Sequence, residues 1–99
     1  MAAYILIDRL SVTDPDKFRA YSGLAKASVA SHGGRYVLRS EAQIEALEGN
    51  WTPSRIVFIE FDDAEQARRW WASPEYARSR VIHEDATISN IILIDDVTC

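Results

Sequence analysis

Polar and charged residues that stand inside apolar stretches are the first candidates for chemistry. An unpaired charge in a buried strand costs several kcal/mol, so each such residue needs a partner or serves a function. The residues of this kind are Asp8, Arg9, Arg39, Glu60 and Asn90. They mark where the sequence departs from an ordinary apolar core.

The position of a turn predicts a contact between Arg39 and Glu60. In a hairpin that reverses at Gly49-Asn50, opposed residues have numbers that sum to about 99, which places 39 opposite 60. The pair is either a structural ion pair at the rim of a sheet or interface, or it lines a cleft. In a cleft, Arg39 would hold a small carboxylate or enolate, and Glu60 would be a catalytic base.

The histidines are the side chains whose ordinary pKa lies near neutrality. His83 is expected on a loop near Glu84 and Asp85, either at the surface or at a pocket rim, where it could be a catalytic base. His32 ends a predicted helix, where an imidazolium complements the helix dipole. His83 is therefore the histidine that we carry forward as a candidate site residue.

Aromatic residues form the other candidate group. Trp51, Trp70 and Tyr76 are either core or interface anchors, or they contact a ligand by stacking. The sequence contains no Cys/His metal spacing, no glycine-rich phosphate loop and no nucleophile elbow. We therefore expect neither a metal nor a cofactor.

Composition limits the class of protein. With 99 residues, 47% hydrophobic and 26% charged, the chain is expected to form a single domain over 1–99. A net charge of −4 argues against nucleic acid as a partner, and no apolar run is long enough for a membrane helix. The lone cysteine, Cys99, fits a reducing compartment, so we predict a cytoplasmic protein.

Hydrophobic periodicity and capping signals predict the elements that position these residues. The expected strands are 4–12, 35–40, 55–61 and 88–97, and the expected helices are 15–32 and 64–80, the second broken at Ser73-Pro74. Between the middle strands, residues 44–48 could extend the strand 35–40 as one arm of a long hairpin.

This order predicts an α+β fold of the ferredoxin-like kind, βαββαβ, with a four-stranded antiparallel sheet and two helices on one face. Because strands 4–12, 55–61 and 88–97 are apolar on both faces, the other face would expose a large apolar patch. A second copy packed on that face would form a homodimer.

The sequence resembles the DUF1330 proteins of unknown function, within the dimeric α/β-barrel superfamily. The motifs are Val12-Thr13-Asp14-Pro15 with Tyr21, Gly33-Gly34-Arg35 with Arg39, Leu47-Glu48-Gly49 with Trp51 and Pro53, Ile59-Glu60-Phe61, and Trp70 with Ser73-Pro74-Glu75-Tyr76. The chain departs from the family pattern at Ser40-Glu41-Ala42, where glycines are frequent, and at Trp71. The resemblance implies the fold and the dimer, but no particular reaction, because the superfamily holds both enzymes and binding proteins.

Two functions are therefore expected in parallel. In the first, the protein binds or transforms a small organic acid or enolisable molecule without a cofactor. In the second, it is a non-catalytic dimer that binds a small ligand or another protein.

Overall fold

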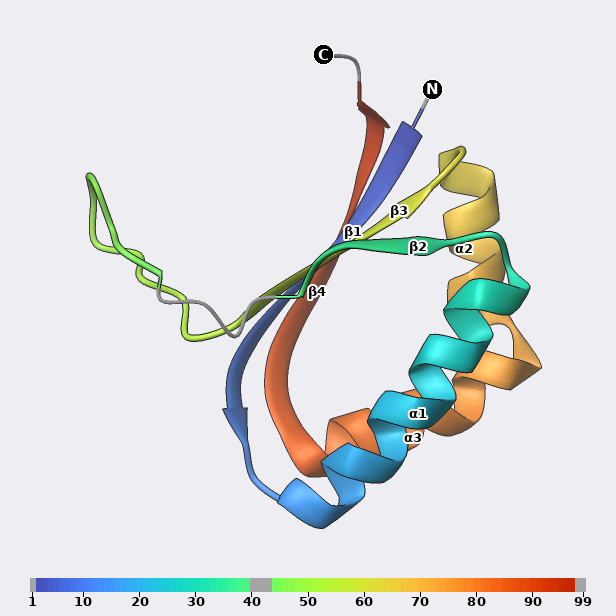
Figure 1. The fold of residues 1–99 in the computed structure, drawn as a ribbon, viewed down its shortest axis with the longest axis horizontal. Helices are drawn as coiled ribbons and strands as arrows, with labels where there is room; N and C mark the ends of the chain where they lie inside the picture. Colours follow the sequence, from blue (N-terminus) through green and yellow to red (C-terminus); the bar gives the residue numbers. More distant parts are fainter. Residues whose placement is uncertain (1, 40–43, 98–99) are drawn as a thin grey trace.

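The computed structural model describes residues 2–39 and 44–97 and arranges them as an antiparallel sheet with helices on one side (Figure 1). The elements are β1 (Ala2–Val12), α1 (Pro15–Ser31), β2 (Arg35–Arg39), β3 (Ile56–Phe61), α2 (Ala64–Ala72), α3 (Pro74–Ala86) and β4 (Thr87–Val97). The sheet has four strands in the order β2-β3-β1-β4. The predicted α+β ferredoxin-like fold is confirmed.

Local capping sets the helix starts as the sequence predicts. The Asp14 side chain accepts a hydrogen bond from the Lys17 backbone N at 3.2 Å, and the Asp63 side chain accepts one from Gln66 N at 2.7 Å. Ser73 ends α2, and its Oγ accepts from the Tyr76 backbone N at 3.1 Å. The predicted break between two helical segments is confirmed.

The end of the last helix differs from the prediction. Helix α3 continues to Ala86 instead of ending near Arg80, because no glycine or proline interrupts residues 80–86. His83 therefore lies in the last turn of a helix and is 4% exposed. Its predicted loop position is wrong.

The core lies between the sheet and the helices. Odd-numbered side chains of β1 and β3 face the helices, so Ile5, Ile7 and Ile59 are buried together with Trp70 and Tyr76 from the helices. Trp70 is fully buried, and its Nε1 donates to Ser28 Oγ at 3.0 Å. This packing fixes α1 and α2 over the same face of the sheet.

The register of β2 on β3 overturns the predicted contact between Arg39 and Glu60. Arg39 lies opposite Val57, and Glu60 lies opposite Arg35, with a register shift between Tyr36 and Leu38. Arg39 therefore faces the helices, while Glu60 faces the other side of the sheet. The Glu60 carboxylate instead accepts from Arg35 Nε at 2.6 Å and from the Tyr4 hydroxyl at 2.8 Å.

An irregular arm explains the wrong register. Residues 44–55, which we call the arm, form no strand and extend away from the sheet in Figure 1. The predicted turn at Gly49-Asn50 lies within this arm, so it does not set the register of β2 on β3. Residues 40–43 and Cys99 lie outside the described residues. Within the described part, no helix has the length and apolar character that a membrane span requires.

The second face of the sheet carries apolar side chains, and none of the described helices covers it. Leu38, Ile92 and Ile94 on this face are 43%, 51% and 37% exposed. Leu6 and Phe58, from the two central strands, lie between them. The prediction that the strands are apolar on both faces is confirmed, and we call these five residues the open face.

Candidate functional site

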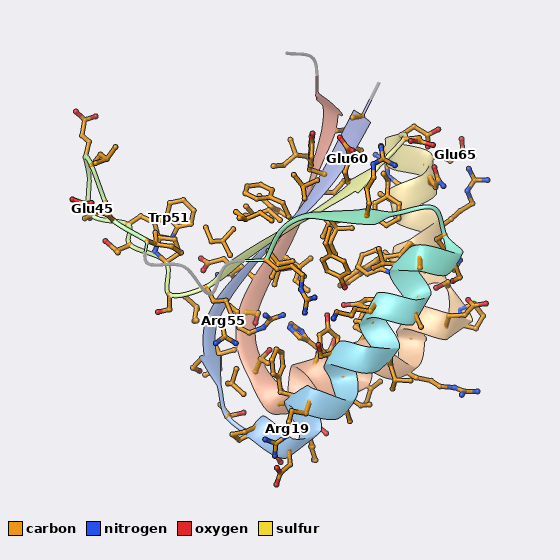
Figure 2. The ribbon with its side chains drawn as sticks, in the orientation of Figure 1. Arg19, Glu45, Trp51, Arg55, Glu60 and Glu65 are labelled. Carbon is orange, nitrogen blue, oxygen red and sulfur yellow. The ribbon has the colours of Figure 1, made fainter. Side chains whose placement is uncertain are left out.

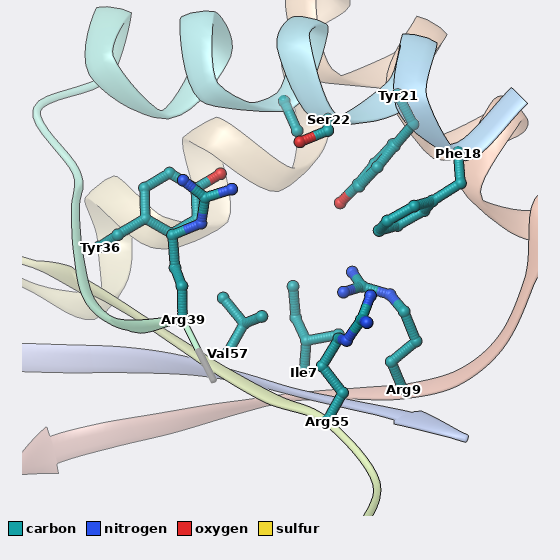
Figure 3. A pocket seen from close by; sticks show the side chains of 10 residues that line it. Ile7, Arg9, Phe18, Tyr21, Ser22, Tyr36, Arg39, Arg55 and Val57 are labelled. Carbon is teal, nitrogen blue, oxygen red and sulfur yellow. The ribbon is translucent and has the colours of Figure 1, made fainter. Parts of the chain in front are cut away.

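A cavity of about 130 Å³ lies between α1 and the sheet (Figure 3). Ile7 and Val57 form its floor, and Phe18 and Tyr21 project into it from α1. Its remaining lining residues are Arg9, Ser22, Ala25, Tyr36, Arg39 and Arg55. The cavity thus combines apolar and aromatic walls with three arginines.

Arg9 is the most unusual residue of the cavity. It is 5% exposed, its Nε has no hydrogen-bond partner within the described residues, and its guanidinium carbon lies 4.6 Å from the centre of the Phe18 ring. Burial lowers the pKa of Arg9, and the neighbouring Arg55 lowers it further. Arg9 is therefore a desolvated cation held against an aromatic ring and a second cation.

No carboxylate of the described residues compensates these cavity cations. Four surface arginines form ion pairs: Arg19 with Asp16, Arg35 with Glu60 and Asp62, Arg68 with Asp95, and Arg69 with Glu65. Among the residues that the structure describes, no carboxylate lines the cavity and none contributes to the shift in the Arg9 pKa. Asp8, next in sequence, projects to the opposite face because side chains alternate along β1.

Backbone pairing brings the cavity arginines together from separate segments. The Arg9 backbone N donates to the Arg55 carbonyl oxygen at 3.0 Å, which places the two residues side by side. Arg39 comes from β2, and its guanidinium carbon lies 5.1 Å from the centre of the Tyr36 ring. Figure 3 shows Arg9 and Arg55 at one end of the cavity and Arg39 with Tyr36 at the other.

Tyrosine hydroxyls add neutral hydrogen-bond donors to the cavity. Burial raises the pKa of Tyr36 to about 12 and also raises the pKa of Tyr21. The Tyr21 hydroxyl lies 3.3 Å from the Tyr76 hydroxyl, whose pKa burial raises as well. These phenols stay protonated at neutral pH, so they can donate to an anion beside the arginines.

His83 lies behind Arg9 and does not line the cavity. Its Nε2 accepts from the Arg9 guanidinium, with Nη2 at 3.4 Å, and the Thr87 hydroxyl lies 3.2 Å from the same nitrogen. Burial lowers the pKa of His83 to about 4, and the charge of Arg9 contributes. At neutral pH His83 is an uncharged acceptor that orients Arg9.

The structure brings only some of the predicted site residues together. Arg39 lines the cavity, whereas His83 and Tyr76 reach it only through Arg9 and Tyr21. Glu60 lies on the other face of the sheet, and hydrogen bonds from Tyr4 and then Arg35 hold its pKa below the usual value. Trp70 belongs to the core, and Trp51 lies on the arm, 58% exposed (Figure 2).

Sequence reasoning singled out Arg9 as a charge in an apolar strand but gave it no role in the site, and it missed Arg55, Tyr21 and Tyr36 altogether. A signal for Arg9 was present, because it continues the buried odd-numbered positions of β1 after Ile7. Arg55 reaches the cavity through its backbone hydrogen bond with Arg9, Tyr21 through the packing of α1 on the sheet, and Tyr36 through the register of β2 on β3. No local pattern contains that information.

The fold and cavity define a small ferredoxin-like α+β protein with an arginine-lined pocket under its first helix. The family model described as "Domain of unknown function (DUF1330)" matches residues 2–97, and the chain belongs to this family. The resemblance seen in the sequence is thereby confirmed. Within the described residues, no three His, Cys, Asp or Glu side chains gather as metal ligands.

Solved structures support the fold. A protein of unknown function from Rhodopseudomonas palustris superposes with a TM-score of 0.73 at 16% identity, covering 99% of this chain and 84% of that one. SnoaB, a cofactor-independent oxygenase from Streptomyces nogalater, gives 0.63 at 15% identity, covering 99% and 94%. A hypothetical Arabidopsis thaliana protein gives 0.67 at 14% identity, covering 99% and 89%. No curated protein matches the sequence.

Proposed function

We propose that this protein binds a small organic anion, such as a carboxylate or enolate, in the cavity between α1 and the sheet. The observation that carries the proposal is Arg9, a buried cation that no carboxylate of the described residues compensates. Burying such a charge costs several kcal/mol unless a counter-charge is supplied. A bound anion would supply it through charge-assisted hydrogen bonds.

The size and walls of the cavity narrow the ligand class. Sites for drug-sized ligands occupy roughly 300–1,000 Å³, whereas this cavity measures about 130 Å³. Its floor of Ile7 and Val57 and its Phe18 wall favour a short carbon skeleton next to the charged group. A small organic acid fits these conditions better than a nucleotide or a large cofactor.

Calorimetric titration with small carboxylic acids, alongside sodium chloride as the ionic control, tests the proposal. We expect at least one acid to bind, and Arg55→Met to weaken it by about tenfold or more through loss of a charge-assisted contact. Arg78→Met, an exposed change on α3 away from the cavity, is the matched control and should bind as the wild type does. The absence of saturable binding for every acid would refute the proposal.

Transformation of the bound acid without a cofactor is the second candidate function. The Tyr21 hydroxyl and the arginine guanidiniums are donors that would stabilise the negative oxygen of an enolate. SnoaB, of similar fold, is a cofactor-independent oxygenase. Solvent water would take the proton released from the carbon beside the carbonyl, because no described carboxylate or histidine lines the cavity. In D₂O, exchange of that hydrogen for deuterium, faster than without protein and slowed by Tyr21→Phe, would support catalysis over binding alone.

We also propose that a second copy of this chain covers the open face. Ile92 lies on this face and is 51% exposed, and face-to-face packing of two sheets would remove such apolar surface from water. Light scattering should give a dimer at micromolar concentration, and Ile92→Asp should give a monomer. Leu24→Asp on α1, where the leucine is 45% exposed, is the matched control and should stay dimeric. The proposed dimer would be refuted if the wild type were a monomer, or if only a different protein bound to the open face.

Location in the cytoplasm and site roles for Glu60 and Trp51 stay predictions. Neither residue lines the cavity, so a role for either one would require a different site.

A further inference from the structure

We propose that the ligand carries an anionic group at each end, as a short dicarboxylate does, with one end held by Arg9 and Arg55 and the other by Arg39. This inference rests on the proposed function, because it concerns the same cavity. It adds the number and the spacing of the charges on the ligand.

The first end of the cavity is built from two adjacent guanidiniums. The backbone hydrogen bond between Arg9 and Arg55 fixes their separation in the fold, and both side chains line the cavity. Each charge lowers the stability of the other unless an anion lies between them, and Arg55 contributes to the lowered pKa of Arg9. A carboxylate has two oxygens, so it can accept from both residues.

The second end is separate from the first. Arg39, Val57 and Ile7 are successive partners across β2, β3 and β1, and Arg9 lies two residues beyond Ile7. Strand spacings of about 4.8 Å and a rise of about 3.4 Å per residue place the Cα atoms of Arg39 and Arg9 about 12 Å apart. Their side chains extend toward the cavity from opposite ends in Figure 3.

The middle of the cavity favours carbon between the charged ends. Ile7 and Val57 lie on the floor between the two arginine groups, and the Tyr21 ring lies above them. A single compact dianion such as phosphate would engage Arg9 and Arg55 but would leave Arg39 and the apolar floor without a ligand group. A chain of a few carbons with a carboxylate at each end uses all of these contacts.

Charge balance points the same way. Three arginines line this cavity of about 130 Å³, and no carboxylate of the described residues lines it. Arg39 forms no ion pair with the described residues, in contrast to Arg35 on the same strand, which binds Glu60 and Asp62. Arg39 is exposed, so solvent can carry its charge in the absence of a ligand; two carboxylates would engage all three cations, whereas one would leave Arg39 to solvent.

Calorimetry with acids matched in chain length tests this inference. The probes are succinate against butyrate, glutarate against pentanoate, and inorganic phosphate. We expect a dicarboxylate to bind at least about tenfold more tightly than its matched monocarboxylate, and Arg39→Gln to abolish this difference by weakening the dicarboxylate more than the monocarboxylate. Arg35→Gln, on the same strand but on the opposite face, is the matched control and should preserve the difference.

The outcomes separate this inference from the proposed function. Equal affinity for matched mono- and dicarboxylates would overturn the two-ended ligand and leave the anion site standing. Tighter binding of phosphate than of any dicarboxylate, unaffected by Arg39→Gln, would also overturn it, because the charge would then lie at one end only. Binding of none of these probes would overturn both.

Discussion

Arg9→Met is expected to stabilise the fold and to abolish anion binding. Methionine has nearly the length of the arginine stem and can keep the packing against Phe18, while it removes a buried charge without a counter-charge. Replacement of buried ionic groups by apolar ones of similar volume stabilises some proteins by about 1–4 kcal/mol. We expect a gain of about 1–3 kcal/mol in the free energy of unfolding on the same grounds.

Loss of ligand binding should accompany that gain. Arg9 is the most buried charge at the cavity, so its removal should weaken binding of the anion by about 100-fold, or about 2.7 kcal/mol. A variant Arg9→Met that is more stable but binds less tightly would show that Arg9 serves a ligand. If Arg9 were structural, its replacement would lower both stability and binding.

Urea unfolding at pH 7.5, followed by tryptophan fluorescence, measures the stability change, and calorimetry measures binding. Arg68→Met is the control for loss of an arginine at the surface. Its ion pair with Asp95 is more than half exposed, so the free energy of unfolding should change by less than about 1 kcal/mol. A loss of more than about 1 kcal/mol in Arg9→Met would mean that this arginine is structural.

The helix starts were predictable from the sequence because capping is local. Asp14, Asp63 and Ser73 each precede the backbone N–H that their side chain accepts by three residues, so the signal and the structure lie in one turn. The end of α3 was not predictable in this way, because no residue between Arg80 and Ala86 stops a helix. The misplaced end moved His83 from a loop to the core.

The residues of the candidate site could not all be predicted, because their positions depend on how the strands pair. The order of the elements predicts which strands are antiparallel, but the irregular arm and the shift between Tyr36 and Leu38 decide which side of the sheet each residue faces. A register error of a few residues put Glu60 beside Arg39 and hid the pairing of Glu60 with Arg35. The candidate cavity depends on such long-range positions, so only its charged strand residues could be singled out in advance.

The free energy of unfolding is expected to decrease as pH is lowered from 6.5 to 4, because His83 then becomes charged. Its pKa is about 4 in the folded protein, lowered by burial and by Arg9, against an ordinary value of 6.5. The unfolded chain therefore binds more protons between these values. The contribution of His83 to the free energy of unfolding is complete above pH 6.5 and is lost below about pH 4. Between these values it decreases by up to about 1.4 kcal/mol for each unit by which the pH is lowered. The total is about 3 kcal/mol.

The variant His83→Gln isolates this effect from the carboxylates, which also take up protons in acid. Glutamine offers an oxygen that can accept from Arg9 but does not titrate, so the free energy of unfolding in urea should vary less steeply between pH 4 and 6.5 than in the wild type. The groups that hydrogen-bond to the His83 ring or pack on it are Arg9, Tyr21 and Thr87, and none of these three changes charge in this range. His32→Gln, on a partly exposed histidine at the end of α1, is run alongside to measure what exchange of a histidine for glutamine does outside the core. Equal slopes for wild type and His83→Gln would show that the imidazole takes up its proton without cost, and that Arg9 does not depend on a neutral histidine.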